Sequence, residues 1–290
     1  MIVTLLGMVK NLHIVGWCMQ NMMRTISLPL LFILFVAACQ PVPSDDPVPT
    51  VADIALLPTS IFLTENAPPP GFGTVTFDPI DSRLADHTGW HYTIIGQFDG
   101  IYDDNGAPAS GQFTADVWAN ELGQARRVVL QINGAAFSPD DNQRVLEGVR
   151  FVDDYYFVDT NGVCTTEGET IRSIADLSAG QLVGGVTAAQ PTGHRQEFEG
   201  GVQAWQYTFA AENARLPAIH RDVSSTVSLA ADLWIAPDPN AVVRYELQAT
   251  VARVRLLFSE RTVSGTLRLQ YDLDLASVNT LPNISVPHGC

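Results

Sequence analysis

The sequence predicts a mainly β domain (α+β) in which one antiparallel sheet curls over a few short helices. Apolar and polar residues alternate with a period of two along most of the chain after residue 89, as in strands with one buried face. Turn sequences such as "DDNGAP" at 103–108 separate these runs, as between the strands of hairpins. Helical periodicity is confined to two short stretches, too small to cover the sheet, so we expect the sheet to curl around them.

The most apolar segment of the chain, Ile26–Ala38, ends at a cysteine, Cys39. Its thirteen residues are too few for a membrane-spanning helix, which needs roughly 20. The segment fits the apolar region of a secretory signal, and Arg24 supplies a basic residue before it. We expect residues 1–38 to be a signal peptide, with translation starting at Met22 or Met23.

The four residues "VAAC" at 36–39 resemble the lipobox of bacterial lipoproteins, in which the cysteine is acylated. A conventional signal is the alternative, because two alanines before the cleavage point suit either peptidase. We expect the signal to export the protein, and lipidation of Cys39 to anchor it to the outer face of the cell membrane or within the envelope.

The acidic charge of the chain argues against nucleic acid as a partner and against membrane binding through a basic patch. Of the 16 basic residues, Lys10 and Arg24 lie in the expected signal, and the other 14 are all arginine, against 31 acidic residues. Such an acidic surface repels phosphate backbones, so nucleic acid is a poor partner. Attachment to a membrane would then depend on the acyl chains and not on a basic patch.

Residues 39–70 begin with a proline-rich and acidic stretch, "QPVPSDDPVPTVA". We expect a lipidated tether over 39–70 and a single domain over 71–290. In that domain Asp78 as N-cap, Pro79 in the first turn and Gly89 as stop predict a short helix. A second helical pattern covers 169–182, where Ile171, Ile174 and Leu177 are spaced by three.

Strand patterns occupy most of the remaining chain. They cover 90–98, 111–122, 126–134, two runs within 149–166, a hairpin over 194–210, 228–236, 242–258 and 265–276. Residues 214–225 are expected to be a connection. The alternation slips at Val251-Ala252 without a turn residue, which predicts a bulge. In the last strand Leu267, Leu269 and Tyr271 share a dry face and Arg268 and Gln270 a wet one.

After the expected signal, which includes Cys18, the chain has two cysteines besides the lipidated one, Cys164 and Cys290. In an exported protein such a pair predicts a disulfide. Two unpaired thiols are the alternative.

Catalytic and metal-binding patterns are missing from the sequence. It contains no glycine-rich phosphate loop, no G-x-S-x-G elbow and no C-x-x-C pair. His87 and His91 are four residues apart, but Gly89 and Trp90 end the expected helix between them, so we interpret them as turn or surface histidines. The acidic stretches 102–106 and 138–143 fit hairpin turns better than calcium loops. We expect no catalytic activity, metal or cofactor.

Four phrases resemble the LolA-like lipoprotein carriers, and the LppX/LprG-type lipoproteins in particular. They are "LEGVRFVDDYYFVDTNGVC", "EFEGGVQAWQYTF", "ADLWIAPDPNAVVRYELQAT" and "LRLQYDLDLASVNTLPNISVP", in the family's order between residues 78 and 287. The resemblance implies a half-barrel with a hydrophobic cavity that binds lipid acyl chains without catalysis. The two expected helices are shorter and less apolar than the family's helices.

We therefore predict an envelope protein that binds or carries a lipid or lipoglycan chain. The alternative is a structural or protein-interaction lipoprotein with the same fold and a filled core. The predicted lining residues are aromatic and apolar sheet positions: Trp90, Tyr92, Ile94, Trp205, Tyr207, Trp234, Tyr245 and Tyr271.

Overall fold

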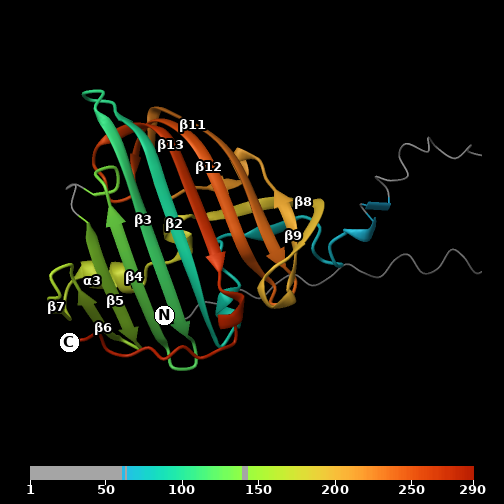
Figure 1. The fold of residues 1–290 in the computed structure, drawn as a ribbon, viewed down its shortest axis with the longest axis horizontal. Helices are drawn as coiled ribbons and strands as arrows, with labels where there is room; N and C mark the ends of the chain where they lie inside the picture. Colours follow the sequence, from blue (N-terminus) through green and yellow to red (C-terminus); the bar gives the residue numbers. More distant parts are fainter. Residues whose placement is uncertain (1–60, 63, 139–142) are drawn as a thin grey trace, which may run out of the picture. The chain divides into compact units, whose positions relative to one another are not determined.

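The protein is described by a computed structural model over residues 61, 62, 64–138 and 143–290. In these residues thirteen strands form one antiparallel sheet, which stays open between β1 and β7 (Figure 1). The expected mainly β fold with few short helices is confirmed at this level. The signal, Cys39 and most of the expected tether lie outside the described residues.

The strands follow one another across the sheet in an order that differs from their order in the chain. In pairing order they are β1 (Val75–Phe77), β8 (Gly185–Glu197), β9 (Gln203–Thr208), β11 (Ile219–Ala236), β12 (Ala241–Leu256), β13 (Thr262–Leu273), β2 (Gly89–Tyr102), β3 (Pro108–Asn120), β4 (Ala125–Asn133), β5 (Arg144–Phe151), β6 (Asp154–Val158) and β7 (Cys164–Thr165). β10 (Ala214–Arg215) pairs with β8 outside this path.

The helical elements are short. They are the α-helices α3 (Glu169–Ala175) and α4 (Ala179–Leu182) and the 3-10 turns η3 (Leu84–Asp86), η4 (Glu199–Gly201), η5 (Ala211–Asn213) and η6 (Leu275–Ser277). In Figure 1, α3 lies behind the sheet, on the side of β4, β5 and β6 that it contacts. Among the described residues, no helix has both the length and the apolar character needed to cross a membrane.

The period-two alternation produces one dry face and one wet face, as predicted. On β13, Leu267, Leu269 and Tyr271 are at most 1% exposed, whereas Arg268 between them is exposed. The dry face joins one hydrophobic cluster with Leu182 of α4 and Val186 of β8. The core therefore lies between the curled sheet and the segments that cross behind it.

The helix predicted near 79–88, with Asp78 as its N-cap, is wrong. The structure has turns there, followed only by η3. Asp78 does not cap a helix, because its carboxylate forms an ion pair with Arg215 at 2.7 Å. Hydrogen bonds from residue i+3 to residue i close the turns and bury Ile80 and Leu84 without an α-helical stretch.

The connection predicted over 214–225 is also wrong, because β11 begins at Ile219. Its pairing with β12 shifts between Arg221 and Thr226, which explains the broken alternation in the sequence. The bulge predicted near Val251 is confirmed. The β12–β13 register shifts between Val251 and Val254, and Arg253 has a φ of 56°.

Residues 103–107 connect β2 and β3, as predicted for a hairpin, whereas 139–142 lie outside the described residues.

The segments on either side of residue 71, the predicted start of the domain, both contact β9. Trp205 Nε1 donates to the Asn66 carbonyl at 3.0 Å, and the Tyr207 hydroxyl donates to the Phe72 carbonyl.

Candidate functional site

Six of the eight predicted lining residues lie in the closed interior of the protein. Tyr92, Ile94, Tyr207, Tyr245 and Tyr271 are 0% exposed and Trp90 is 3% exposed. A side chain facing a space wider than a water molecule would retain accessible surface. These six therefore contact protein atoms on all sides in this structure.

The other two are tryptophans at the periphery of the core. Trp205 lies opposite Ile235 on the dry face and is half-buried. Trp234 points to the wet face, where it lies opposite Arg244 and 5.8 Å from the Phe198 ring. Trp234 does not share a face with the six interior residues.

Tyr92 is the centre of a polar cluster inside the core. Its hydroxyl donates to Asp81 Oδ2 at 3.1 Å and accepts from the Ala179 backbone N–H at 2.9 Å. The Arg126 guanidinium approaches the same oxygen at 3.4 Å. Burial, followed by the charge of Asp81, raises the pKa of Tyr92, so this phenol stays protonated.

Tyr271 and Tyr245 continue this row of aromatic residues across the next two strands. The Tyr92 and Tyr271 rings are 5.0 Å apart, and Tyr271 lies directly opposite Tyr245. Neither the Tyr271 nor the Tyr245 hydroxyl has a hydrogen-bond partner among the described residues. Burial raises the pKa of both phenols. They are therefore neutral hydroxyls, able to donate or accept one hydrogen bond inside an apolar core.

The core is only partly covered along one edge of β11. β9 pairs with β11 only from Asp232 to Ile235, so residues 219–231 have a described strand partner on one side only. Val227, Leu229 and Ala231 point to the dry face here and remain half-buried. Phe209, which follows the last residue of β9, is also half-buried and stacks on Tyr245 at 6.0 Å.

We call Val227, Leu229, Ala231 and Phe209 the edge strip. It is a half-exposed apolar surface that continues into the buried dry face, because Leu229 lies opposite Ala249 and Val227 opposite Val251, both at most 2% exposed. The edge strip therefore connects solvent to the tyrosine row, which consists of Tyr92, Tyr271 and Tyr245, with Phe209 covering Tyr245. The sequence does not predict the edge strip, because the pairing of β11 with β9 joins segments without a recognisable hairpin.

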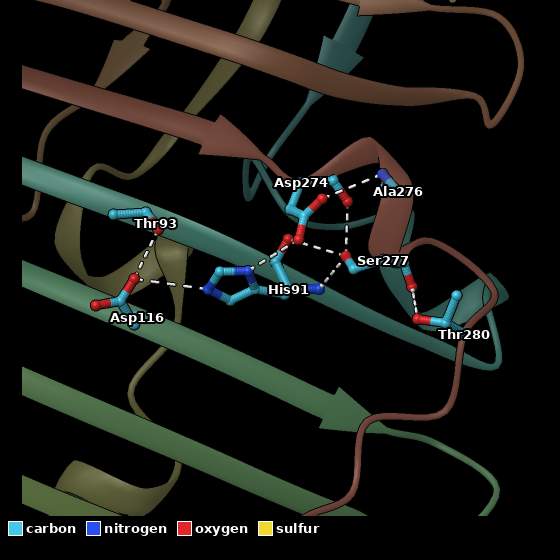
Figure 2. A network of polar contacts seen from close by, with 7 residues as sticks. All are labelled: His91, Thr93, Asp116, Asp274, Ala276, Ser277 and Thr280. Carbon is cyan, nitrogen blue, oxygen red and sulfur yellow. Dashed lines mark hydrogen bonds and ion pairs between the residues drawn. The ribbon is translucent and has the colours of Figure 1, made fainter. Parts of the chain in front are cut away.

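The wet face carries a histidine between two carboxylates (Figure 2). His91 Nδ1 lies 3.3 Å from Asp274 and Nε2 lies 3.5 Å from Asp116, which also accepts from the Thr93 hydroxyl at 2.7 Å. The His91 ring stacks on Trp118 at 4.6 Å. Burial alone would lower the pKa of His91, but the two aspartates outweigh it and raise that pKa.

This histidine network joins the end of β13 to β2. The His91 backbone N–H donates to Ser277 Oγ at 2.8 Å, and Ser277 Oγ donates to the Asp274 carbonyl at 2.6 Å (Figure 2). His87 lies elsewhere, with Nε2 2.9 Å from the Pro239 carbonyl. In the part of the chain that the structure describes, no group of three or more His, Cys, Asp or Glu side chains could hold a metal ion.

Cys164 and Cys290 form a disulfide, with their Cα atoms 5.4 Å apart. The bond joins β7, which forms one edge of the sheet, to residue 290. The two cysteines are separated by 126 positions in the sequence, so the bond closes a long loop.

Comparison with known proteins adds little to this description. No family model matches the chain, and no curated protein matches it significantly. Among solved structures, the chain is similar to an uncharacterized conserved protein from Thermus thermophilus. The two share 10% identity over 78% of this chain and 90% of the other, with a TM-score of 0.24.

Proposed function

We propose that this chain is a non-catalytic, lipid-anchored envelope protein that binds the apolar chain of a lipid behind its curled sheet. The LolA-like phrases in the sequence, the lipobox before Cys39 and the one-sided sheet support this proposal together. On this view the protein is exported, is held to a membrane by acylation of Cys39, and belongs among the LolA-like and LppX/LprG-type lipoproteins.

The observation that carries the proposal is the edge strip beside Tyr245. Half-exposed apolar side chains are common on protein surfaces. Here, however, they lie along the uncovered edge of β11 and continue into the core. An acyl chain entering along the edge strip would displace Phe209 and reach Tyr245 and Tyr271. Burial of its methylene groups would contribute roughly 25 cal/mol per Å².

The unpartnered hydroxyls of Tyr245 and Tyr271 fit the same proposal. Buried polar groups in proteins nearly always have a hydrogen-bond partner. Two adjacent phenols without one, at the inner end of an apolar path, provide hydrogen-bonding groups for an ester or carboxyl oxygen of a lipid. The apolar surroundings would exclude a polar ligand that lacks a hydrocarbon chain.

A filled-core interaction protein is the second candidate, and one observation favours it. Five of the predicted lining residues are fully buried, so an acyl chain has no preformed space among them. They are Tyr92, Ile94, Tyr207, Tyr245 and Tyr271. Lipid binding therefore requires the core to open at the edge strip, and a variant at that strip distinguishes the two candidates.

The test compares two neighbouring residues of β11 that point to opposite faces. Leu229→Glu introduces a charge into the edge strip and should abolish uptake of a fluorescent fatty acid. Ser228→Glu places the same charge on the wet face and should leave uptake unchanged. Both positions are at least partly exposed, so we expect both variants to fold. Lack of uptake by the wild-type protein would favour the filled-core candidate. Equal uptake by the two variants would show that lipid does not enter at the edge strip.

A further inference from the structure

A row of five long polar side chains crosses the wet face of the sheet. Direct register pairs place Gln248 beside Arg268, Arg268 beside Gln97, Gln97 beside Gln112, and Gln112 beside Asn133. The five residues belong to β12, β13, β2, β3 and β4. With strands about 4.8 Å apart, the row runs about 19 Å across the sheet. We call these five residues the amide row.

The amide row lies in a hollow of the wet face. All five side chains line a depression of about 560 Å³, together with residues that include Asp99, Ser110 and Thr266. A second depression of about 420 Å³ shares Gln97, Gln248 and Arg268 with the first and continues towards Asp232 and Gln270. The hollow is therefore open to solvent and has a predominantly polar wall.

The side chains of the amide row have no internal partners, in contrast to two bonded pairs further along the same face. Towards one end of the strands, Arg244 pairs with Asp272 at 2.6 Å and Thr93 with Asp116 at 2.7 Å. No side chain of the amide row makes a hydrogen bond or ion pair within the described part of the chain. All five residues are exposed. Their hydrogen-bonding groups are available in a line, on a rigid sheet.

The chemistry of this row points to a neutral ligand rich in hydroxyl groups. Each amide offers two N–H donors and a carbonyl acceptor, and a hydroxyl group both donates and accepts. The charges that line the larger hollow, Arg268 and Asp99, balance each other, although the whole chain has a formal charge of −15. A polyanion would meet the repulsion of the whole chain. An acyl chain would leave the amides without partners.

We infer that the amide row is a binding site for a neutral oligosaccharide, which lies across β12, β13, β2, β3 and β4. Its hydroxyl groups exchange hydrogen bonds with the four amides and accept from the Arg268 guanidinium. This site is on the opposite face from the tyrosine row and does not depend on lipid binding there.

Calorimetric titration of the full chain with maltohexaose, cellohexaose and chitohexaose tests the site. At least one of these neutral sugars should bind the wild-type protein. Gln97→Ala and Arg268→Ala should each weaken that binding by about fivefold, the effect of losing one or two hydrogen bonds. Gln131→Ala is the matched control, since Gln131 is an exposed glutamine of the same face that lines neither hollow.

Three results would overturn the inference. The first is that none of the three sugars binds. The second is that a sugar binds but Gln97→Ala and Arg268→Ala behave like Gln131→Ala, which places the site elsewhere. The third is that heparin or phosphatidylcholine vesicles bind in an Arg268-dependent manner and the neutral sugars do not. Near-ultraviolet circular dichroism checks that each variant is folded.

Discussion

Tyr245 lies directly opposite Tyr271 on neighbouring strands, and both hydroxyls are buried without a hydrogen-bond partner among the described residues. The third tyrosine of the row, Tyr92, has a fully bonded hydroxyl. The buried hydroxyl of Tyr92 should therefore stabilise the fold, whereas those of Tyr245 and Tyr271 should not. Substituting one tyrosine at a time by phenylalanine measures the difference in the free energy of unfolding.

Tyr271→Phe should leave the free energy of unfolding unchanged or raise it by about 1 kcal/mol, because it removes a buried polar atom that gains nothing in the folded state. Tyr92→Phe should lower it by about 1–3 kcal/mol, because Asp81 and the Ala179 N–H lose their partner. Urea unfolding measures both values. A larger loss for Tyr271→Phe than for Tyr92→Phe would show that the Tyr271 hydroxyl is bonded in the folded protein.

The Cys164–Cys290 disulfide should contribute substantially to stability, because it closes a long loop. For a separation of 126 residues, the chain-entropy model gives about 5 kcal/mol. The Cys164→Ser/Cys290→Ser double variant should therefore unfold at a much lower urea concentration than the wild-type protein under non-reducing conditions. Adding a reductant should move the wild-type midpoint towards that of the variant. Coincident midpoints without reductant would contradict this expectation.

His91 should make stability depend on pH. Its folded pKa is raised, so its interaction with Asp116 and Asp274 stabilises the fold fully below its unfolded pKa of about 6.5. This contribution is lost as the pH rises through the folded pKa. The hydrogen bond to His91 lowers the pKa of Asp116, so the contribution of Asp116 is lost only in acid, as the pH falls through that pKa.

His91→Gln tests this dependence, because it retains a polar side chain and removes the titration. The wild-type protein should lose free energy of unfolding between pH 6 and pH 9, and the variant should lose less. His220→Gln is the control, since His220 is an exposed histidine of β11. Equal slopes for the wild type and His91→Gln would contradict the assignment.

The sequence predicts those parts of the fold that depend on local pattern. The β2–β3 hairpin follows from alternation and from the turn at 103–107, and this hairpin alone brings His91 beside Trp118 and Thr93 beside Asp116. The dry face of β13 and the bulge near Arg253 follow from the same alternation.

The sites depend on pairings that no local pattern determines. Gln97 meets Arg268 because β2 pairs with β13, a strand from the far end of the chain. The edge strip exists because β9 is shorter than β11. The helix predicted near 79–88 is absent for a related reason, since the ion pair of Asp78 with Arg215 is a contact between distant segments.

Native mass spectrometry of the Cys39→Ala protein, which carries no anchor and can be purified without detergent, tests the central proposal most directly. The proposal predicts a population whose mass exceeds that of the Cys39→Ala chain by one lipid molecule, which disappears when Leu229→Glu is added and persists when Ser228→Glu is added. A single lipid-free mass for the Cys39→Ala protein, together with no uptake of an added fatty acid, would contradict lipid binding behind the sheet.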